Sequence, residues 1–467
     1  MPDQPNVLLL YVDQQRGDAL GCAGNPDVLT PNLDALAARG TRFDRHYVQN
    51  PVCMPSRLSM LTGRYPSNTG VTHMAVPVPE DTEHLATHLG RAGYRTANLG
   101  KLHFLPHSNR DHSLPHPSYG FDHLEISDEP GPYDDAYRAH VRRTMPDQLE
   151  HISKHVYPPS AAIWREQTVH RDPVEHPETW DPWRTVPFAG ADEATHTAFV
   201  GQRTIDYVRR DHGTPFFCIA GIYSPHSPLV APQRFLDLYD PAALTVEAYP
   251  PELREAAEAK GFTDAHLRQM THGYYAMISE VDHWVGRIME HVPDNTVVAF
   301  TSDHGEFLGD QLALGKGYPG PDSVSRVPLI VATPDGKRGH VCEEVVEAVD
   351  LAPTLLQLAG VPVPSYLDGT SLVPALTGGS PTLKRGGALM EDDMRREGPW
   401  RSLRDDRYRY ILLHDGTERL FDCDAEFGEY RDVAADEAYR EILLTKRHEM
   451  ATRLLNVVTP EPRTWCY

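Results

Sequence analysis

Continuous apolar runs bounded by polar residues recur along the chain, and this feature restricts the fold most. Residues 6–12 read NVLLLYV, residues 215–223 read PFFCIAGIY, and residues 295–301 and 327–332 have the same character. Runs without polar alternation are typical of strands buried on both faces of a parallel sheet. Helical patterns alternate with them, at residues 31–39, 82–93, 191–210, 267–291 and 345–360. We therefore predict an α/β fold with a doubly wound, mostly parallel central sheet flanked by helices.

The composition changes near residues 378–387, where Gly, Ser, Pro and Lys accumulate. We therefore expect a large α/β domain over residues 1–380 and a C-terminal α+β subdomain over residues 381–467. The subdomain should contain a small antiparallel sheet, because residues 400–422 alternate between polar and apolar, and a final helix. Residues 104–190 are rich in Pro, His and Asp, and we interpret them as a variable cap inserted in the large domain.

Bulk composition excludes several classes of partner. The net charge is -22 over 467 residues, so nucleic acid would be repelled. The sequence has no apolar run long enough to cross a membrane, and its first residues lack the pattern of a signal peptide, so we expect a cytoplasmic protein. Six Cys without a CxxC pair predict neither a disulfide framework nor a zinc site.

One short stretch, CMPSR at residues 53–57, carries a candidate reactive side chain. Pro55 suits the first turn of a helix and Gly63 suits its end, so Cys53 should lie at a helix N-terminus. Such a position binds anions and would favour an ionised Cys53. Arg57, one turn further on, adds a permanent positive charge. The alternative interpretation of Cys53 is a small buried hydrophobic residue.

The pattern Cys-x-Pro-Ser-Arg followed by Leu-Thr-Gly-Arg resembles the signature of the sulfatase family, a branch of the alkaline phosphatase superfamily. In that family the Cys is oxidised after translation to formylglycine, whose hydrated aldehyde is the nucleophile. Further segments resemble the family along most of the chain, among them NVLLLYVD, GKLHF, SPH and FTSDHGE. The C-terminal segments RYRYILL and LFDCDAEFGE resemble its terminal subdomain.

Polar residues follow the predicted strands at the ends where open α/β sheets bind ligands. Asp13, Gln14, Asp303 and His304 offer hard oxygen ligands and one imidazole. With an oxygen derived from Cys53, they would hold one divalent cation, which would lower the pKa of the nucleophilic hydroxyl.

A second group of strand-end and loop residues offers positive charge and hydrogen bonds, and could surround the peripheral oxygens of a sulfate. Its members are Arg57, Lys101, His103, His226 and Lys316. The resemblance implies that Arg57 fixes the formylglycine hydrate, and that Lys101 and His103 contact the formylglycine and the sulfate. His103 would also serve as the base that lets the aldehyde reform.

The resemblance implies that His226 and Lys316 bind the ester and protonate the leaving alcohol, while His73 is a further substrate contact. Two positions depart from many sulfatases, which have Asp-Asp after the first strand and Asp-Asn at the later pair. Here the pairs are Asp13-Gln14 and Asp303-His304, which look more like choline sulfatases and phosphonate monoester hydrolases. We therefore expect calcium or manganese as the cation, because an imidazole ligand also suits manganese.

These patterns predict a formylglycine- and metal-dependent enzyme that hydrolyses a small sulfate monoester to an alcohol and sulfate. One alternative keeps the chemistry and makes the substrate a phosphonate monoester or a phosphodiester. Another is a non-catalytic anion-binding protein in which Cys53 remains a thiol. The enzyme would need a formylglycine-generating enzyme as a partner for maturation. The tail at residues 463–467 could dock a second copy in a homo-oligomer.

Overall fold

The structure is a computed structural model that describes residues 4–74, 76–106, 115–154, 181–381, 383, 385–393 and 398–457. Much of the predicted cap and the predicted docking tail at residues 463–467 lie outside these ranges. Within the described ranges, every helix is too short or too polar to traverse a lipid bilayer.

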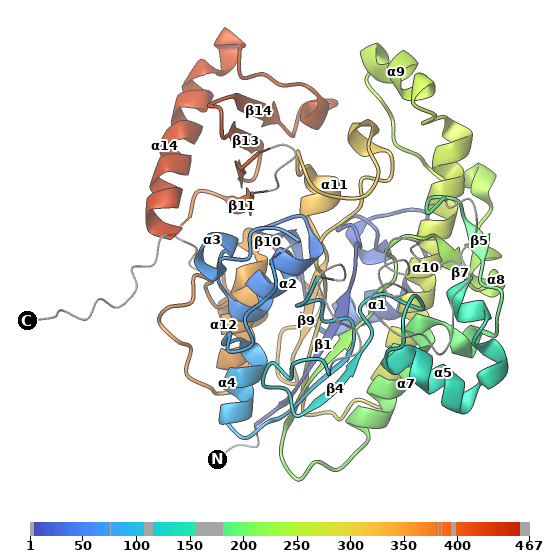
Figure 1. The fold of residues 1–467 in the computed structure, drawn as a ribbon. Helices are drawn as coiled ribbons and strands as arrows, with labels where there is room; N and C mark the ends of the chain where they lie inside the picture. Colours follow the sequence, from blue (N-terminus) through green and yellow to red (C-terminus); the bar gives the residue numbers. More distant parts are fainter. Residues whose placement is uncertain are drawn as a thin grey trace, which may run out of the picture.

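An eight-stranded sheet forms the centre of the molecule, with the strand order β10-β2-β9-β8-β1-β6-β3-β4 (Figure 1). Its strands are β1 (Asn6–Val12), β2 (Thr41–Tyr47), β3 (Arg95–Gly100), β4 (His123–Ile126), β6 (Phe216–Gly221), β8 (Thr296–Ser302), β9 (Leu329–Ala332) and β10 (His340–Glu347). Neighbouring strands run parallel except where β9 pairs with β8 and β2. The prediction of a mostly parallel central sheet is confirmed.

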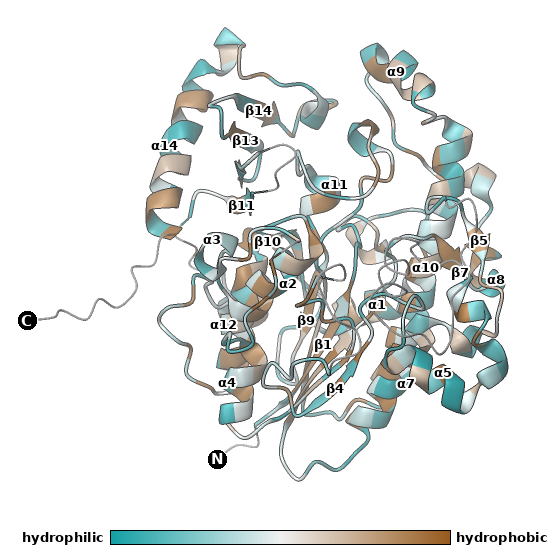
Figure 2. Ribbon diagram, in the orientation of Figure 1, coloured by the Kyte–Doolittle hydropathy of each residue, from teal (hydrophilic) through white to brown (hydrophobic). Residues whose placement is uncertain are grey.

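Helices cover both faces of this sheet (Figure 1). One face carries α2 (Cys53–Thr62), α4 (Leu85–Arg91) and α12 (Leu351–Leu358), and the other carries α1 (Pro31–Arg39), α7 (His196–Val208) and α10 (Asp264–Met289). Along β1, Val7 and Leu9 pack toward the first group of helices. Leu8 and Leu10 pack toward the second group. Because neither face meets water, the strand is mostly apolar, as the hydropathy colours of Figure 2 show.

The C-terminal part of the chain forms a separate antiparallel sheet covered by one helix. Its strands are β11 (Ala388–Asp392), β12 (Trp400–Arg404), β13 (Tyr408–Leu413) and β14 (Glu418–Asp422), and the helix is α14 (Arg440–Val457). Leu389 and Tyr410 of the sheet share a core with Leu443 and Met450 of the helix. The predicted antiparallel sheet and final helix are confirmed, whereas the boundary near residue 380 stays a prediction.

Shorter elements complete the fold. They are α3 (Pro66–Thr69), α5 (Ala136–Thr144), β5 (Val186–Pro187), β7 (Val230–Ala231), α8 (Gln233–Leu236), α9 (Arg254–Ala259), α11 (Asp322–Ser325) and α13 (Val373–Leu376). Within the predicted cap, residues 123–126 form β4, which pairs with β3 at the edge of the central sheet. Part of the predicted cap thus belongs to the central sheet, and the bounds of the cap stay a prediction.

Three predictions about individual elements were wrong. The helix expected over residues 345–360 begins only at Leu351, because residues up to Glu347 form β10, paired with β2, and Ala348–Asp350 form a 3₁₀ turn. The helix expected over residues 82–93 is shorter, because the His84 side chain caps it by accepting from the Ala86 N–H. Thr30, expected as the N-cap of the helix at residues 31–39 because it precedes Pro31, does not cap α1, since its hydroxyl accepts from the Gly21 N–H.

Candidate active site

The register of the sheet brings the predicted strand-end residues to one edge. Val12 of β1 lies opposite Ser302 of β8, so Asp13 and Asp303 leave neighbouring strands side by side. Gly100 of β3 lies opposite Gly221 of β6, which places Lys101 beside the segment that leads to His226. These strands are parallel, so their carboxyl ends form a single ligand-binding edge.

The N-terminus of α2 meets the same edge. Cys53 is the first residue of α2, Pro55 lies in its first turn, and Gly63 ends it with a φ of +66°. That positive φ suits glycine, which has no Cβ to clash. The prediction that Cys53 lies at a helix N-terminus is confirmed, and its side chain is buried.

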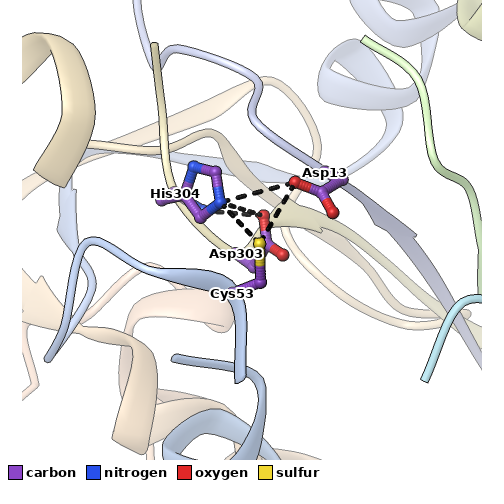
Figure 3. A group of neighbouring side chains, drawn as sticks. All are labelled: Asp13, Cys53, Asp303 and His304. Atoms are coloured by element: carbon purple, nitrogen blue, oxygen red, sulfur yellow. Dashed lines mark hydrogen bonds and ion pairs between the residues drawn. The ribbon is translucent and has the colours of Figure 1, made fainter. Parts of the chain in front are cut away.

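Asp13, Cys53, Asp303 and His304 converge in one buried cluster (Figure 3). One candidate ligand atom from each lies within 4.8 Å of all the others. His304 Nε2 is 3.1 Å from Cys53 Sγ, 3.4 Å from Asp13 Oδ1 and 3.6 Å from Asp303 Oδ1. The sulfur stands where an oxygen of a modified Cys53 would be.

The chemistry of these donors fits a divalent cation. His304 Nδ1 lies 2.8 Å from the Gly305 carbonyl, which can only accept, so Nδ1 carries the proton of the neutral ring. Nε2 then turns a lone pair toward the two carboxylates. Burial lowers the pKa of His304, which keeps the ring neutral. Lone pairs that face one another repel unless a cation lies among them, so the cluster is suited to a metal ion.

Gln14 is held beside this cluster in a left-handed conformation, with a φ of +69°. Its backbone N–H donates to Asp303 Oδ1 at 3.1 Å. Its side-chain NH₂ group donates to Glu306, so its carbonyl Oε1 turns toward Lys316 Nζ, 3.5 Å away. Gln14, which the sequence predicts as an oxygen ligand, thus turns its side-chain oxygen to the side where Lys316 contacts Cys53.

Arg57 and Lys101 bind the carboxylate oxygens that point away from the cluster. Arg57 Nε donates to Asp303 Oδ2 at 2.7 Å, and its Nη2 is 3.6 Å from Asp13 Oδ2. Lys101 Nζ lies 2.5 Å from Asp13 Oδ2 and 4.7 Å from the centroid of the Tyr223 ring. Burial alone would raise the pKa of Asp13, but Lys101 and the other nearby positive groups hold it well below its ordinary value.

Replacing Arg57 by Met should lower the free energy of unfolding by about 3–5 kcal/mol. The change leaves the fully buried carboxylates of Asp13 and Asp303 with less positive charge. Urea unfolding of metal-depleted protein measures the loss. The matched control is Arg91→Met, which breaks an exposed pair with Glu83 and should cost less than about 1 kcal/mol. Equal losses in the two variants would contradict the importance of the buried pairs.

The structure contradicts the prediction of an ionised Cys53. Burial, followed by the Asp13 carboxylate, raises the pKa of the thiol to about 11, although Lys316 and Lys101 act in the opposite direction. The position at a helix N-terminus does not compensate for complete burial. Unmodified Cys53 is therefore a neutral thiol at physiological pH, and a poor nucleophile.

Lys316 and His226 form a hydrogen-bonded pair next to Cys53. Lys316 Nζ is 2.7 Å from Cys53 Sγ and 2.9 Å from His226 Nε2. His226 Nδ1 lies 2.6 Å from the Ser227 carbonyl, so Nδ1 carries the ring proton and Nε2 accepts from the ammonium. Burial, and next the charge of Lys316, lower the pKa of His226 well below its ordinary value. Lys316 is therefore the proton carrier of the pair.

His103 is buried after β3, with a φ of +57°. The Asp128 carboxylate accepts from its backbone N–H at 2.7 Å and from that of Leu102 at 2.9 Å. Asp128, Glu306 and Tyr223 therefore support the site, although none of them is among the residues predicted from the sequence. Glu306 is the last residue of the segment FTSDHGE and Tyr223 directly precedes SPH, whereas Asp128 belongs to neither segment. His73 lies in the loop after α3, and its role as a substrate contact stays a prediction.

Comparisons with known proteins agree with this geometry. The family model described as Sulfatase matches residues 5–361, and the model described as N-sulphoglucosamine sulphohydrolase, C-terminal, matches residues 321–456. The chain is 29% identical to an arylsulfatase of Clostridium perfringens, over 94% of this chain and 92% of that protein. It is 28% identical to a choline-sulfatase of Rhizobium meliloti, over 92% of this chain and 82% of that protein.

A similar solved structure is that of the phosphonate monoester hydrolase of Agrobacterium radiobacter. The TM-score is 0.80 at 27% identity, and the match covers 97% of this chain and 96% of that one. The family model alone spans well over half of the sequence. The chain therefore belongs to the sulfatase family of the alkaline phosphatase superfamily, and it is a sulfuric ester hydrolase.

Proposed function

We propose that this enzyme hydrolyses a small sulfate monoester with formylglycine at position 53 and one divalent cation. The observation that carries the proposal is the position of Cys53 Sγ. It lies among the candidate metal ligands Asp13, Asp303 and His304 and within 2.7 Å of Lys316. An unmodified thiol with a raised pKa does not explain why candidate metal ligands and Lys316 surround this position. An oxygen nucleophile between a cation and a proton donor does explain it.

Formylglycine and the cation would have distinct tasks. Hydrated formylglycine supplies an oxygen nucleophile for sulfur, and the cation supplies positive charge that lowers the pKa of that hydroxyl and neutralises an ester oxygen. Asp13, Gln14, Asp303 and His304 would hold the cation, and it is calcium or manganese. The mixed set of carboxylate, amide and imidazole donors suits either ion.

The remaining residues handle charge and protons. Lys316, which carries the proton of its pair with His226, would protonate the oxygen of the leaving alcohol when the S–O ester bond breaks. Lys101 and His103 would bind the peripheral oxygens of the sulfate, and His103 would accept the proton whose loss releases sulfate and reforms the aldehyde. Arg57 would orient the Asp303 carboxylate, to which its Nε donates, as well as fixing the hydrate.

A phosphonate monoester or a phosphodiester is the second candidate substrate. It is supported by the similarity to the phosphonate monoester hydrolase of Agrobacterium radiobacter. Sulfate and phosphonate esters present similar oxyanions to the same cationic groups. The two candidates are separated by comparing kcat/KM for an aryl sulfate and an aryl phosphonate with the same leaving group.

The mass of the tryptic peptide spanning residues 46–57 tests the nucleophile. Maturation requires an oxidant and a formylglycine-generating enzyme, so the protein is co-expressed with that enzyme before digestion. We expect the mass of an aldehyde in place of the thiol, together with activity on an aryl sulfate. A peptide that keeps its thiol under these conditions would contradict the proposal. It would leave a non-catalytic anion-binding protein as the remaining interpretation.

A further inference from the structure

Glu306 is a fully buried carboxylate that the proposed chemistry does not use. Three N–H groups point at its two oxygens. Oε2 accepts from the side-chain NH₂ of Gln14. Oε1 accepts from the backbone N–H of Leu308 at 2.9 Å and of Gly315 at 2.7 Å. The residue thus connects the end of β1 to the loop that precedes Lys316.

The contact with Glu306 determines which way the Gln14 amide faces. The Gln14 backbone is already fixed, because its N–H donates to Asp303 and its carbonyl accepts from the Tyr274 hydroxyl at 2.7 Å. The orientation of the side-chain amide then depends on the groups that the amide contacts. The Gln14 NH₂ faces Glu306 Oε2, to which it donates, and the Gln14 oxygen therefore faces the other way. That other side is where Lys316 Nζ lies.

The second oxygen of Glu306 anchors the segment that carries Lys316. Gly315 donates its N–H to Glu306, and its carbonyl accepts from the Phe307 N–H at 2.9 Å. Both peptide groups of Gly315 are thereby fixed one residue before Lys316. The Lys316 ammonium can then reach Cys53 Sγ and His226 from a defined position. One carboxylate therefore orders both sides of the candidate active site.

We propose that Glu306 is a positioning residue that keeps the Gln14 oxygen turned toward the cation and holds the Lys316 segment in place. This inference rests on the proposed metal-dependent function. Partners behind metal ligands commonly change metal affinity by about 10–100-fold when they are removed. The Glu306–Gln14 contact has the geometry of such a partner, because it selects which atom of an amide meets the metal.

The test replaces Glu306 by Gln and restores the contact with a second change. In Glu306→Gln, one side-chain oxygen still accepts from Leu308 and Gly315, but an NH₂ group now faces Gln14. The Gln14 amide must rotate to accept, which turns its own NH₂ toward the cation. We expect the affinity for Ca²⁺ and Mn²⁺, each titrated into metal-depleted protein, to fall about 10–100-fold.

The double variant Gln14→Glu with Glu306→Gln should recover about tenfold of that loss. The carboxylate introduced at position 14 accepts from the amide introduced at position 306 with one oxygen and presents the other to the cation. The net charge of the double variant equals that of the wild type. Asp310→Asn is the matched control, because Asp310 lies in the same loop and contacts Ser323 rather than Gln14. Its metal affinity should match the wild type, and thermal unfolding verifies that every variant folds.

The outcomes separate the inference from the function on which it rests. Wild-type affinity in Glu306→Gln, or a double variant that binds no better than Glu306→Gln, would overturn the positioning role alone. A loss in Asp310→Asn as large as that in Glu306→Gln would do the same, because general loss of charge in the loop would then suffice. A wild-type protein that binds neither cation would overturn the metal-dependent function together with the inference.

Discussion

Replacing Cys53 by Ala should lower kcat/KM for an aryl sulfate at least about 10⁴-fold while the protein still folds. The change removes the atom that maturation would replace by oxygen, so no nucleophile can form. Alanine is also a good residue for the first turn of α2 and leaves the backbone of that helix unchanged. The buried carboxylates keep their partners Arg57 and Lys101. Steady-state kinetics measures the loss, and thermal unfolding checks the fold.

Cys22→Ala is the matched control for this variant. Cys22 is a half-buried thiol in the short helical turn after β1, and its backbone N–H, which the substitution keeps, donates to Asp34. Its turnover should stay within about twofold of the wild type, as for a substitution away from the catalytic groups. Turnover by Cys53→Ala above one hundredth of the wild-type rate would contradict a covalent role for position 53. The cation and the cationic side chains would then have to activate water directly.

The sequence predicted the parts of the site that follow from strand topology. The segments after β1 and β8 were identified because an apolar run ends abruptly in Asp13-Gln14 and in Asp303-His304. Parallel pairing of the two strands is enough to bring these ends together, because Val12 and Ser302 lie opposite each other in the sheet. The Cys53 helix was predictable for a similar reason, because proline and glycine mark its two ends.

The sequence did not predict elements whose pattern depends on their neighbours. β2 reads TRFDRHY, which has too many charged residues to resemble a buried strand, yet it lies between β9 and β10. Its charged side chains, Arg42, Asp44 and Arg45, are only partly buried, whereas Thr41 and His46 are buried, so tertiary context overrides the local pattern. The end of β10 has the sequence pattern of a helix, because only the 3₁₀ turn Ala348–Asp350 separates Val345 and Val346 from the true helix α12.

The ionisation of Cys53 also could not be predicted from the sequence. A helix N-terminus and Arg57 suggested an ionised Cys53, but Arg57 is engaged by Asp303 and Asp13 instead. Burial and the neighbouring Asp13 carboxylate then raise the pKa of the thiol by more than Lys316 and Lys101 lower it. The contact between Glu306 and Gln14 joins residues 292 positions apart, so it too required the fold.

Replacing Lys316 by Met should lower kcat by about 10²–10⁴-fold for a sulfate ester of an alkyl alcohol. An alkoxide is a poor leaving group, so it needs the proton that Lys316 carries. The loss should be far smaller for a nitrophenyl sulfate, because nitrophenolate can leave without protonation. Methionine keeps most of the length of lysine and removes only the ammonium. Kinetics on the two esters, with the same variant under the same conditions, measures the difference.

The dependence on the leaving group separates two roles that Lys316 could have. Its Nζ lies close to both Cys53 Sγ and His226 Nε2, so it is placed to protonate an alcohol or to bind an ester oxyanion. An oxyanion contact would be lost equally for both esters, because the peripheral oxygens are the same. Equal losses would therefore contradict proton donation and assign Lys316 to binding. Lys260→Met, at the exposed end of α9, should leave both rates unchanged and controls for the loss of a charge. A large loss confined to the alkyl ester would identify Lys316 as the general acid, with neutral His226 orienting it through Nε2.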